Sequence, residues 1–380
     1  MREIKFKDFI KLNRGFDLPN DKMVMGDFPV VASTSIKGYH DEYKVLPPVV
    51  VTGRSGSLGS VQYIEKACTP LNTTLYVKDF KGNDPEYVYY YLKMMHLESF
   101  NSGAGVPTLN QNHLHGLKLK IHELQKQKKV ANVLSAYDDL IEANNRRIEL
   151  LEQTAQELYK EWFVRFRFPG YESAKFENGL PEGWELKKIG DIAHVKSGYA
   201  FKSEWWINEG VPVVKIKDIQ GNTIDFGDLS HVSEDHAEIA KQFYIVEGDL
   251  LIAMTGATIG KMALVPYSEK QMVVNQRVGK FFLGESPAEK VAFLYMTLQQ
   301  NWVQELIVMI AGSNAAQPNI SPFDIEKIKV VYNEDMVDEY NRRSAPFIEE
   351  ILQLRKHNQN LATQRDMLLP RLMSGKLEVN

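Results

Sequence analysis

The sequence contains a single cysteine, no long apolar run and no excess of positive charge. Cys68 alone can form neither an internal disulfide nor a cysteine metal cluster, which fits the reducing conditions of the cytoplasm. No stretch of about 18 uncharged apolar residues occurs, so we expect no membrane span. The charged first residues also lack the continuous apolar segment of a secretory signal. These features predict a cytoplasmic protein without a membrane anchor.

The net charge argues against a broad basic surface. It is −4, with a pI of about 6.2, whereas proteins that contact phosphates usually carry a basic footprint. The charge is uneven: residues 1–125 hold 15 Lys and Arg against 13 Asp and Glu, and residues 169–333 hold 15 against 21. Any contact with a polyanion would therefore come from local patches.

The usual catalytic motifs are missing. The stretch TGATIGKM at 255–262 is close to a nucleotide-binding P-loop, but it has three residues instead of four between its glycines, and Met262 follows the lysine. The sequence contains no dinucleotide fingerprint, no Asn/Asp-Pro-Pro-aromatic motif, and no HExxH or GxSxG motif. We therefore expect a non-catalytic chain with no metal site, and we interpret 255–262 as a tight turn between two strands.

The chain repeats itself, with the same motifs in the same order in both halves. The matches are Gly15-Phe16 with Gly198-Tyr199, Pro29-Val30-Val31 with Pro212-Val213-Val214, Ser57-Leu58-Gly59 with Thr258-Ile259-Gly260, and Pro107 and Leu109 with Pro318 and Ile320. The offset grows along the chain from 183 to 201 and then 211. Because surface loops tolerate insertions, this growth predicts loop insertions in the second copy.

A long heptad pattern follows each copy. The first seam is Val130, Leu134, Tyr137, Ile141, Asn144, Ile148, Leu151, Ala155, Leu158 and Trp162. The second is Val337, Tyr340, Ser344, Phe347, Ile351, Leu354, Asn358, Leu361, Arg365, Leu368 and Leu372. A sustained 3.5-residue repeat keeps one stripe against a partner helix. We expect the two helices to pair, with Asn144 and Asn358 able to fix their register. Pro346 would kink the second helix or mark its start.

The predicted fold is α+β, with two pseudo-symmetric globular α/β domains separated by two long helices that form an antiparallel coiled coil. The predicted segments are a first domain at 1–122, a central helix at 123–168, a second domain at 169–333 and a C-terminal helix at 334–380.

Several further stretches are distinctive: LPEGW at 180–184, GDLL at 248–251 leading to GATIGK at 256–261, NQ at 275–276, AQPNIS at 316–321 and LPRLMSGKL at 369–377. They resemble the DNA-specificity subunits of type I restriction-modification systems. The resemblance covers essentially the whole chain and includes both heptad regions. The first copy departs from the pattern, because it lacks the PEGW opening and has Thr73 and Thr74 after Asn72 where Asn-Gln would be expected.

The resemblance implies that each globular copy is a target-recognition domain for one half of a split site in double-stranded DNA. It also implies two methyltransferase subunits docked on the helix pair, which use S-adenosylmethionine to methylate adenine at N6, and restriction subunits that translocate and cut DNA. The specificity subunit itself would hold no cofactor. Rigid helices suit this role because they fix the distance between two readers better than a flexible linker does.

The candidate DNA contacts are polar residues in the loops of each copy, because Arg can bind guanine, and Asn or Gln can bind adenine, in the major groove. In the first copy they are Lys37, Tyr39, Arg54, Ser55, Ser57, Asn110, Gln111 and Asn112. In the second copy they are Lys215, Lys217, Lys261, Gln276, Arg277, Asn314 and Gln317.

Two alternatives stay open. The chain could be the recognition part of a related restriction-methylation architecture that pairs with another enzyme. It could also be a coiled-coil scaffold whose duplicated domains bind protein, which the negative net charge favours slightly. Salt-dependent DNA affinity separates the scaffold from both DNA-binding alternatives, because phosphate contacts release counterions.

Overall fold

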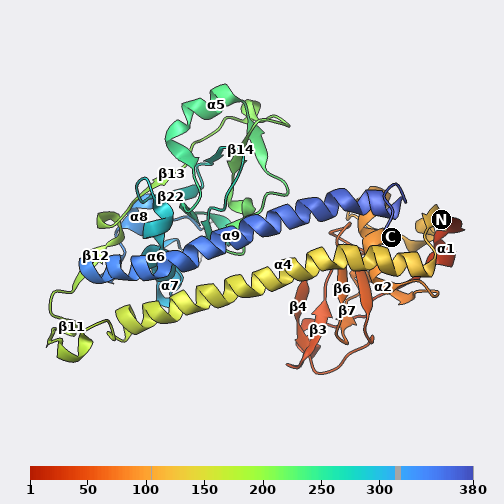
Figure 1. The fold of residues 1–380 in the computed structure, drawn as a ribbon, viewed down its shortest axis with the longest axis horizontal. Coiled ribbons are helices and arrows are strands. Elements are labelled where there is room, and N and C mark those ends of the chain that lie inside the picture. The colour runs from red at the N-terminus through yellow and green to blue at the C-terminus, as the bar shows by residue number, and fades with distance from the viewer. Residues whose placement is uncertain (104, 313–317, 380) are drawn as a thin grey trace. The chain divides into compact units, whose positions relative to one another are not determined.

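The computed structural model describes residues 1–103, 105–312 and 318–379. The chain divides into two compact units: unit 1 comprises Met1–Glu142 and Asn360–Asn380, and unit 2 comprises Ala143–Gln359. Each unit combines one globular α/β segment with a part of both long helices, α4 (Leu124–Tyr159) and α9 (Glu334–Met373) (Figure 1). Within the described ranges, no helix is both long and apolar enough to cross a membrane.

Unit 1 is built on small sheets packed beside short helices. A four-stranded antiparallel sheet has the order β2-β8-β5-β6, a three-stranded sheet the order β4-β3-β7, and β1 pairs with β9. The strands are β1 (Arg2–Lys5), β2 (Lys11–Arg14), β3 (Phe28–Val31), β4 (Ile36–His40), β5 (Val49–Gly53), β6 (Val61–Ile64), β7 (Thr69–Pro70), β8 (Thr74–Asp79) and β9 (Lys118–Ile121). The helices are α1 (Phe6–Phe9), α2 (Pro85–Met94) and α3 (Gln111–Leu114).

Unit 2 repeats this arrangement with additions. Its sheets have the orders β13-β22-β19-β20 and β17-β14-β21-β18, and β12-β23, β10-β11 and β15-β16 form strand pairs. The strands are β10 (Phe176–Glu177), β11 (Leu180–Pro181), β12 (Glu185–Lys188), β13 (His194–Ser197), β14 (Val211–Val214), β15 (Ile219–Gln220), β16 (Thr223–Ile224), β17 (Ser230–Val232), β18 (Tyr244–Ile245), β19 (Leu250–Ala253), β20 (Met262–Leu264), β21 (Met272–Val274), β22 (Val278–Phe282) and β23 (Lys329–Tyr332). The helices are α5 (Glu234–Ile239), α6 (Pro287–Leu298), α7 (Asn301–Ile310) and α8 (Pro322–Glu326).

Strand pairing confirms the duplication. The parallel pair β3·β7 has its counterpart in β14·β21, with Val31 opposite Pro70 and Val214 opposite Val274. Most of the inserted residues of the second copy lie between β14 and β19, where the hairpin β15-β16 and helix α5 have no equivalent in unit 1. The insertions therefore fall in connections and leave the paired strands intact, as the growing offset predicted.

Gly15 and Gly198 occur in both copies for the same steric reason. A Cβ at Gly15 would stand 2.2 Å from the carbonyl oxygen of Leu71, and a Cβ at Gly198 would stand 2.3 Å from that of Val274. Both distances are far below van der Waals contact. The chain therefore needs glycine wherever this segment crosses the parallel strand pair.

The long helices pack along the predicted seams. Every seam residue of α4 and α9 is buried or half-buried, and none is exposed. Contacts within the units show the antiparallel direction: Asn144 meets Asn358 and Ala155 meets Tyr340 in unit 2. The predicted coiled coil is thus confirmed. Helix α9 begins at Glu334 and continues through Pro346, so the alternative that Pro346 marks its start is wrong.

Asparagines interrupt the apolar seam in unit 2. The Asn144 side-chain amide donates to Asn358 Oδ1 at 2.8 Å, and the Asn358 amide donates to Asn145 Oδ1 at 2.8 Å. A polar pair in a coiled-coil seam favours the one register in which both amides are satisfied, at some cost in stability. This matches the register role expected for Asn144 and Asn358.

Each globular segment is tied to the helix pair by a tyrosine, a carboxylate and an arginine. In unit 1 the hydroxyl of Tyr90 on α2 donates to Asp138 on α4 at 2.6 Å, and Arg365 on α9 pairs with the same carboxylate. In unit 2 the hydroxyl of Tyr295 on α6 donates to Glu152 at 2.6 Å, and Arg355 bonds Glu152 at 3.0 Å. Such half-buried ion pairs add little net stability, but they select one docking geometry.

Replacing Asn144 and Asn358 by leucine tests the register pair. Each single change should cost about 1 kcal/mol in the free energy of unfolding, because it leaves a half-buried amide without its partner. The double change should cost less than the sum, because two leucines bury apolar surface instead. Urea unfolding monitored by circular dichroism measures all three variants. Gln353→Leu, at an exposed position of α9, is the matched control. Strict additivity of the two single effects would contradict a coupled pair.

Gly15→Ala tests the steric account of the duplicated glycine. The added methyl group overlaps two backbone carbonyls, so unit 1 should lose about 1–3 kcal/mol of stability. Gly116→Ala, whose Cβ would meet nothing within 4 Å, should change stability by less than about 0.5 kcal/mol. The thiol of Cys68 is buried in unit 1, and its rate of labelling in a urea series reports the opening of this unit. Equal labelling of the two variants would refute the steric account.

Candidate nucleic-acid interface

Two parallel strands of unit 2 end side by side at one edge. β14 and β21 run in the same direction, and the backbone N–H of Asn275 donates to Val214 O at 2.9 Å. Lys215 and Gln276 therefore follow neighbouring strand ends. Loops at the carboxyl ends of parallel strands commonly carry binding residues, because the strands hold them at a common edge.

Three further backbone hydrogen bonds close this edge. Gly256 N donates to Pro318 O at 2.9 Å, Ile320 N to Met254 O at 3.0 Å, and Met254 N to Arg277 O at 3.0 Å. They bring together the turn after β19, the segment before α8 and the turn between β21 and β22. We call these three segments, residues 254–261, 275–277 and 318–320, edge 2.

Unit 1 closes an equivalent edge with the same hydrogen bonds. Gly56 N donates to Pro107 O at 2.9 Å, Leu109 N to Arg54 O at 2.8 Å, and Arg54 N to Thr73 O at 2.8 Å. Residues 54–60, 71–73 and 107–112 form this edge 1. By these equivalent bonds, Thr73 of the first copy corresponds to Arg277 of the second, and Asn72 corresponds to Gln276. The first copy therefore offers short side chains where the second offers a long amide and a guanidinium.

Most predicted contacts gather at these edges. Arg54, Ser55, Ser57, Asn110, Gln111 and Asn112 lie on edge 1, and Lys261, Gln276 and Arg277 lie on edge 2. Ser57, Asn110, Asn112, Lys261, Gln276 and Arg277 are exposed. Arg54 is half-buried and donates from Nη1 to Asn72 O at 3.3 Å, so part of its guanidinium is already used. Asn110 caps α3 by accepting from Asn112 N at 3.0 Å.

The lysines after β14 are engaged within the protein. The Lys215 ammonium lies 3.6 Å from the centre of the Trp206 ring and donates to Ser230 Oγ at 2.8 Å. Burial lowers the pKa of Lys215. Lys217 forms an ion pair with Asp228 at 2.7 Å, and this hydrogen bond raises the pKa of Lys217. A phosphate would have to compete with these partners.

Two more predicted residues, Lys37 and Tyr39, lie on β4. Tyr39 on β4 lies opposite Pro29, towards the amino end of β3, whereas edge 1 lies at the carboxyl end of that strand. Lys37 lies towards the carboxyl end of β3, between Ile36 and Gly38, and its ammonium already donates to Asn20 Oδ1 at 2.6 Å. Asn314 and Gln317 lie outside the described residues, so their predicted role stays a prediction.

Several polar residues share the edges without having been predicted. Ser33 donates to Thr73 O at 2.9 Å on edge 1, and a bridge joins Thr255 to Asn319 on edge 2. The corresponding bridge in unit 1 joins Ser55 to Thr108, which makes Thr255 the counterpart of the predicted Ser55. No signal in the sequence marked Thr255, because at the offset of 201 between Ser57 and Thr258 it aligns with Arg54 and not with Ser55. No repeat match marked Ser33 or Thr73 either.

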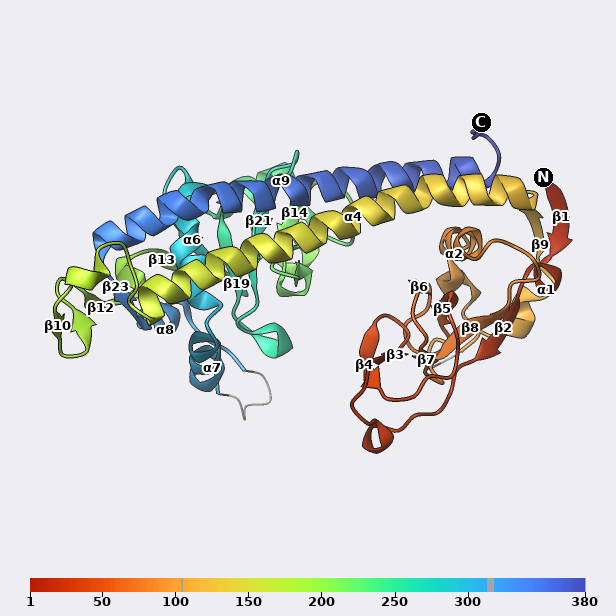
Figure 2. The same cartoon turned by 60° about the horizontal axis from the view of Figure 1, so that its bottom comes forward.

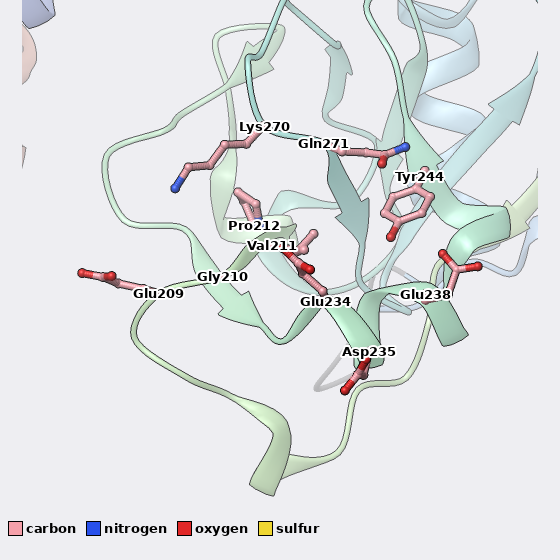
Figure 3. A pocket seen from close by; sticks show the side chains of 10 residues that line it. All are labelled: Glu209, Gly210, Val211, Pro212, Glu234, Asp235, Glu238, Tyr244, Lys270 and Gln271. Atoms are coloured by element: carbon pink, nitrogen blue, oxygen red, sulfur yellow. The ribbon is translucent and has the colours of Figure 1, made fainter.

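An acidic hollow of about 730 Å³ lies at the opposite end of β14 (Figure 3). Its lining includes the carboxylates of Glu209, Glu234, Asp235 and Glu238, with Lys270 the single cation among its lining residues. Gly210, Val211 and Pro212 form its wall at the amino end of the strand. Because carboxylates repel phosphates, this hollow is a poor surface for nucleic acid, whereas edge 2 lies at the carboxyl end of the same strand.

Comparison with known proteins gives one consistent family. A family model described as the type I restriction modification DNA specificity domain matches residues 1–153 and again residues 181–332. The MjaIX specificity subunit of Methanocaldococcus jannaschii is 28% identical over 342 residues, covering 85% of this chain and 77% of that protein. The MjaVIII specificity subunit of the same organism is 25% identical over 303 residues, covering 78% and 71%.

A solved structure shares the fold. The crystal structure of a type I restriction-modification S subunit from M. genitalium superposes with a TM-score of 0.55 at 19% identity. The match covers 100% of this chain and 96% of that one. Both copies and both long helices therefore occur in that fold.

Proposed function

The chain belongs to the type I restriction modification DNA specificity family, and we propose that each of its two copies reads one half of a split DNA sequence. A specificity subunit supplies recognition, so the chain is not itself an enzyme, and methylation and cleavage belong to the subunits that join it. The proposal goes beyond the family in assigning the reading surfaces to edges 1 and 2.

The assignment rests on the backbone hydrogen bonds that join the three loops of each edge, which are the same in both copies. In both copies a glycine N–H donates to a proline carbonyl, from Gly56 to Pro107 and from Gly256 to Pro318, each at 2.9 Å. These hydrogen bonds hold the equivalent three loops together in each copy, although the side chains on the loops differ. Two readers with one backbone and different side chains suit a target whose halves differ in sequence.

The side chains on edge 2 can make both kinds of DNA contact. Gln276 can bind an adenine and Arg277 a guanine through paired hydrogen bonds in the major groove, and Lys261 can bind a phosphate. On edge 1 the exposed amides of Asn110 and Asn112 and the hydroxyl of Ser57 can read bases, and Arg54 would leave Asn72 to do so. Both edges combine positioning contacts with base contacts, as sequence readers require.

We further propose the partners and their cofactor. Two methyltransferase subunits dock on the α4–α9 helix pair and use S-adenosylmethionine to methylate adenine at N6, and restriction subunits complete the complex. Exposed apolar residues on the helices support a docking role, among them Leu140 and Leu150, which are 48% and 46% exposed. The assembly would work in the cytoplasm, where the free thiol of Cys68 stays reduced.

Sequencing of modified bases tests the two-reader proposal. Cells that express the chain with the methyltransferase encoded beside it should contain N6-methyladenine in a two-part motif with a fixed gap. Replacing residues 169–333 by another recognition domain should change one half of the motif and leave the other half and the gap length unchanged. A change in both halves would contradict independent readers. An assembled complex that leaves no methylated motif would favour the scaffold alternative.

Salt dependence tests the contacts on edge 2. Lys261→Ala should weaken DNA binding for all sequences and lower the slope of log K against log salt by about 0.9, the share of one phosphate contact. Gln276→Ala should instead relax base preference at one position and leave the slope unchanged. Lys270→Ala removes an exposed lysine beside the acidic hollow and should change neither quantity. Fluorescence anisotropy across a salt series measures the slope, and an unchanged slope for Lys261→Ala would remove this residue from the interface.

A further inference from the structure

Helix α7 (Asn301–Ile310) is an addition specific to the second copy. In unit 1 its place is taken by one 3-10 turn, Leu97–Phe100. Equivalent hydrogen bonds in the two copies show that Thr74 corresponds to Val278 and Leu109 to Ile320. The offset between the copies grows by seven residues across this interval. The second copy has therefore gained about two helical turns of chain at this place.

One face of α7 is fixed to edge 2. Val303 and Ile307 are fully buried in the core of unit 2. The Gln304 amide donates to Gly260 O at 3.3 Å, in the turn after β19, and to Leu298 O at 2.6 Å. The helix is therefore held against the same turn that carries Lys261. Figure 2 shows α7 on the side of unit 2 that lies away from α4 and α9.

The carboxyl end of α7 is hydrogen-bonded to edge 2. Asn319 N donates to Ala311 O at 3.2 Å, and the same Asn319 is bridged to Thr255. Ala311 follows the last residue of α7. The carboxyl end of the helix is thus joined through Asn319 to the turn of edge 2 that also carries Lys261.

That final turn presents apolar side chains to solvent. Met309 is 66% exposed, Ile310 40% and Val308 38%. Three consecutive exposed apolar residues are costly unless something covers them. The carboxyl end of a helix also carries a partial negative charge, which disfavours a phosphate at this place. Apolar base edges, above all the C5-methyl group of thymine, fit the chemistry better than the DNA backbone does.

We propose that Val308, Met309 and Ile310 form an apolar base contact in the half-site read by the second copy, with thymine methyl groups as the preferred partner. The inference rests on the proposed assignment of edge 2 to DNA. Lys261 and Arg277 would contact the DNA on edge 2, and the three apolar residues at the end of α7 would discriminate between bases at one or two positions of the half-site. Unit 1 lacks this contact, so only one half-site depends on it.

The test uses the full chain and duplexes selected by it from a random-sequence pool. The wild-type chain should select a two-part motif, and deoxyuridine in place of the contacted thymine should weaken binding about fourfold, the value of one buried methyl group. In the double variant Met309→Gln, Ile310→Gln, that replacement should have almost no effect, and thymine should lose its enrichment in one half-site. The salt slope should stay as in the wild type, because no phosphate contact is removed.

Trp302→Gln provides the matched control. Trp302 is 46% exposed at the amino end of the same helix, and its replacement should leave the thymine preference and the deoxyuridine effect unchanged. A double variant that keeps the wild-type response to deoxyuridine would overturn the inference while the proposed function stands. Loss of methyltransferase association with unchanged DNA selection would overturn it too, in favour of a protein partner. No selected motif and no salt-dependent binding by the wild type would overturn both proposals.

Discussion

The packing of α4 against α9 is the constraint on which both units depend. Neither globular segment closes its core alone: the core of unit 1 includes Val130 and Leu134 of α4 and Leu372 of α9, and that of unit 2 includes Ile148 and Ile351. The apolar seam residues of each long helix are in turn buried only because the two helices pack against each other. Folding of each recognition segment is therefore coupled to pairing of two helices that are far apart in the sequence.

Polar groups give this packing its specificity. Apolar heptads tolerate shifts of register, whereas the Asn144–Asn358 pair is satisfied in one register only. The two tyrosine–carboxylate–arginine clusters act similarly for the globular segments. Burial raises the pKa of Tyr295 well above its usual value, so its hydroxyl stays a donor to Glu152 throughout the physiological range. Contacts of this kind trade stability for one defined geometry.

A second constraint separates the scaffold from the residues that we propose to contact DNA. The hydrogen bonds that join the loops of edges 1 and 2 are made by backbone N–H and carbonyl groups. They therefore do not depend on the identity of most side chains there. Glycine is needed where the backbones approach closely, as at Gly15 and Gly198, and where the turns of the edges have a positive φ, as at Gly56 and Gly256. Side chains at the edges can then vary without loss of the fold. The charge distribution follows the same division, with carboxylates around the hollow at the amino end of β14 and the exposed Lys261 and Arg277 on edge 2.

The sequence by itself determined the architecture. Duplication, the two heptad seams and the turn at 255–262 are periodic or local patterns, and such patterns dictate structure without knowledge of distant partners. They also indicated the loops that carry Ser57, Asn110 and Lys261, because polar residues beside glycine or proline mark exposed turns.

Only the tertiary structure decided which polar residues share an edge. The ammonium of Lys215 lies over the ring of Trp206, Lys217 pairs with Asp228, and Tyr39 lies on β4 opposite Pro29, at the end of β3 remote from edge 1. Thr255 was identified as the counterpart of Ser55 by strand pairing and not by alignment, because insertions shift the offset between the copies. The exposed tip of α7 also followed from burial of the opposite helix face. Hydrogen-bond partners and burial are set by residues that are distant in the chain, and no local pattern encodes them.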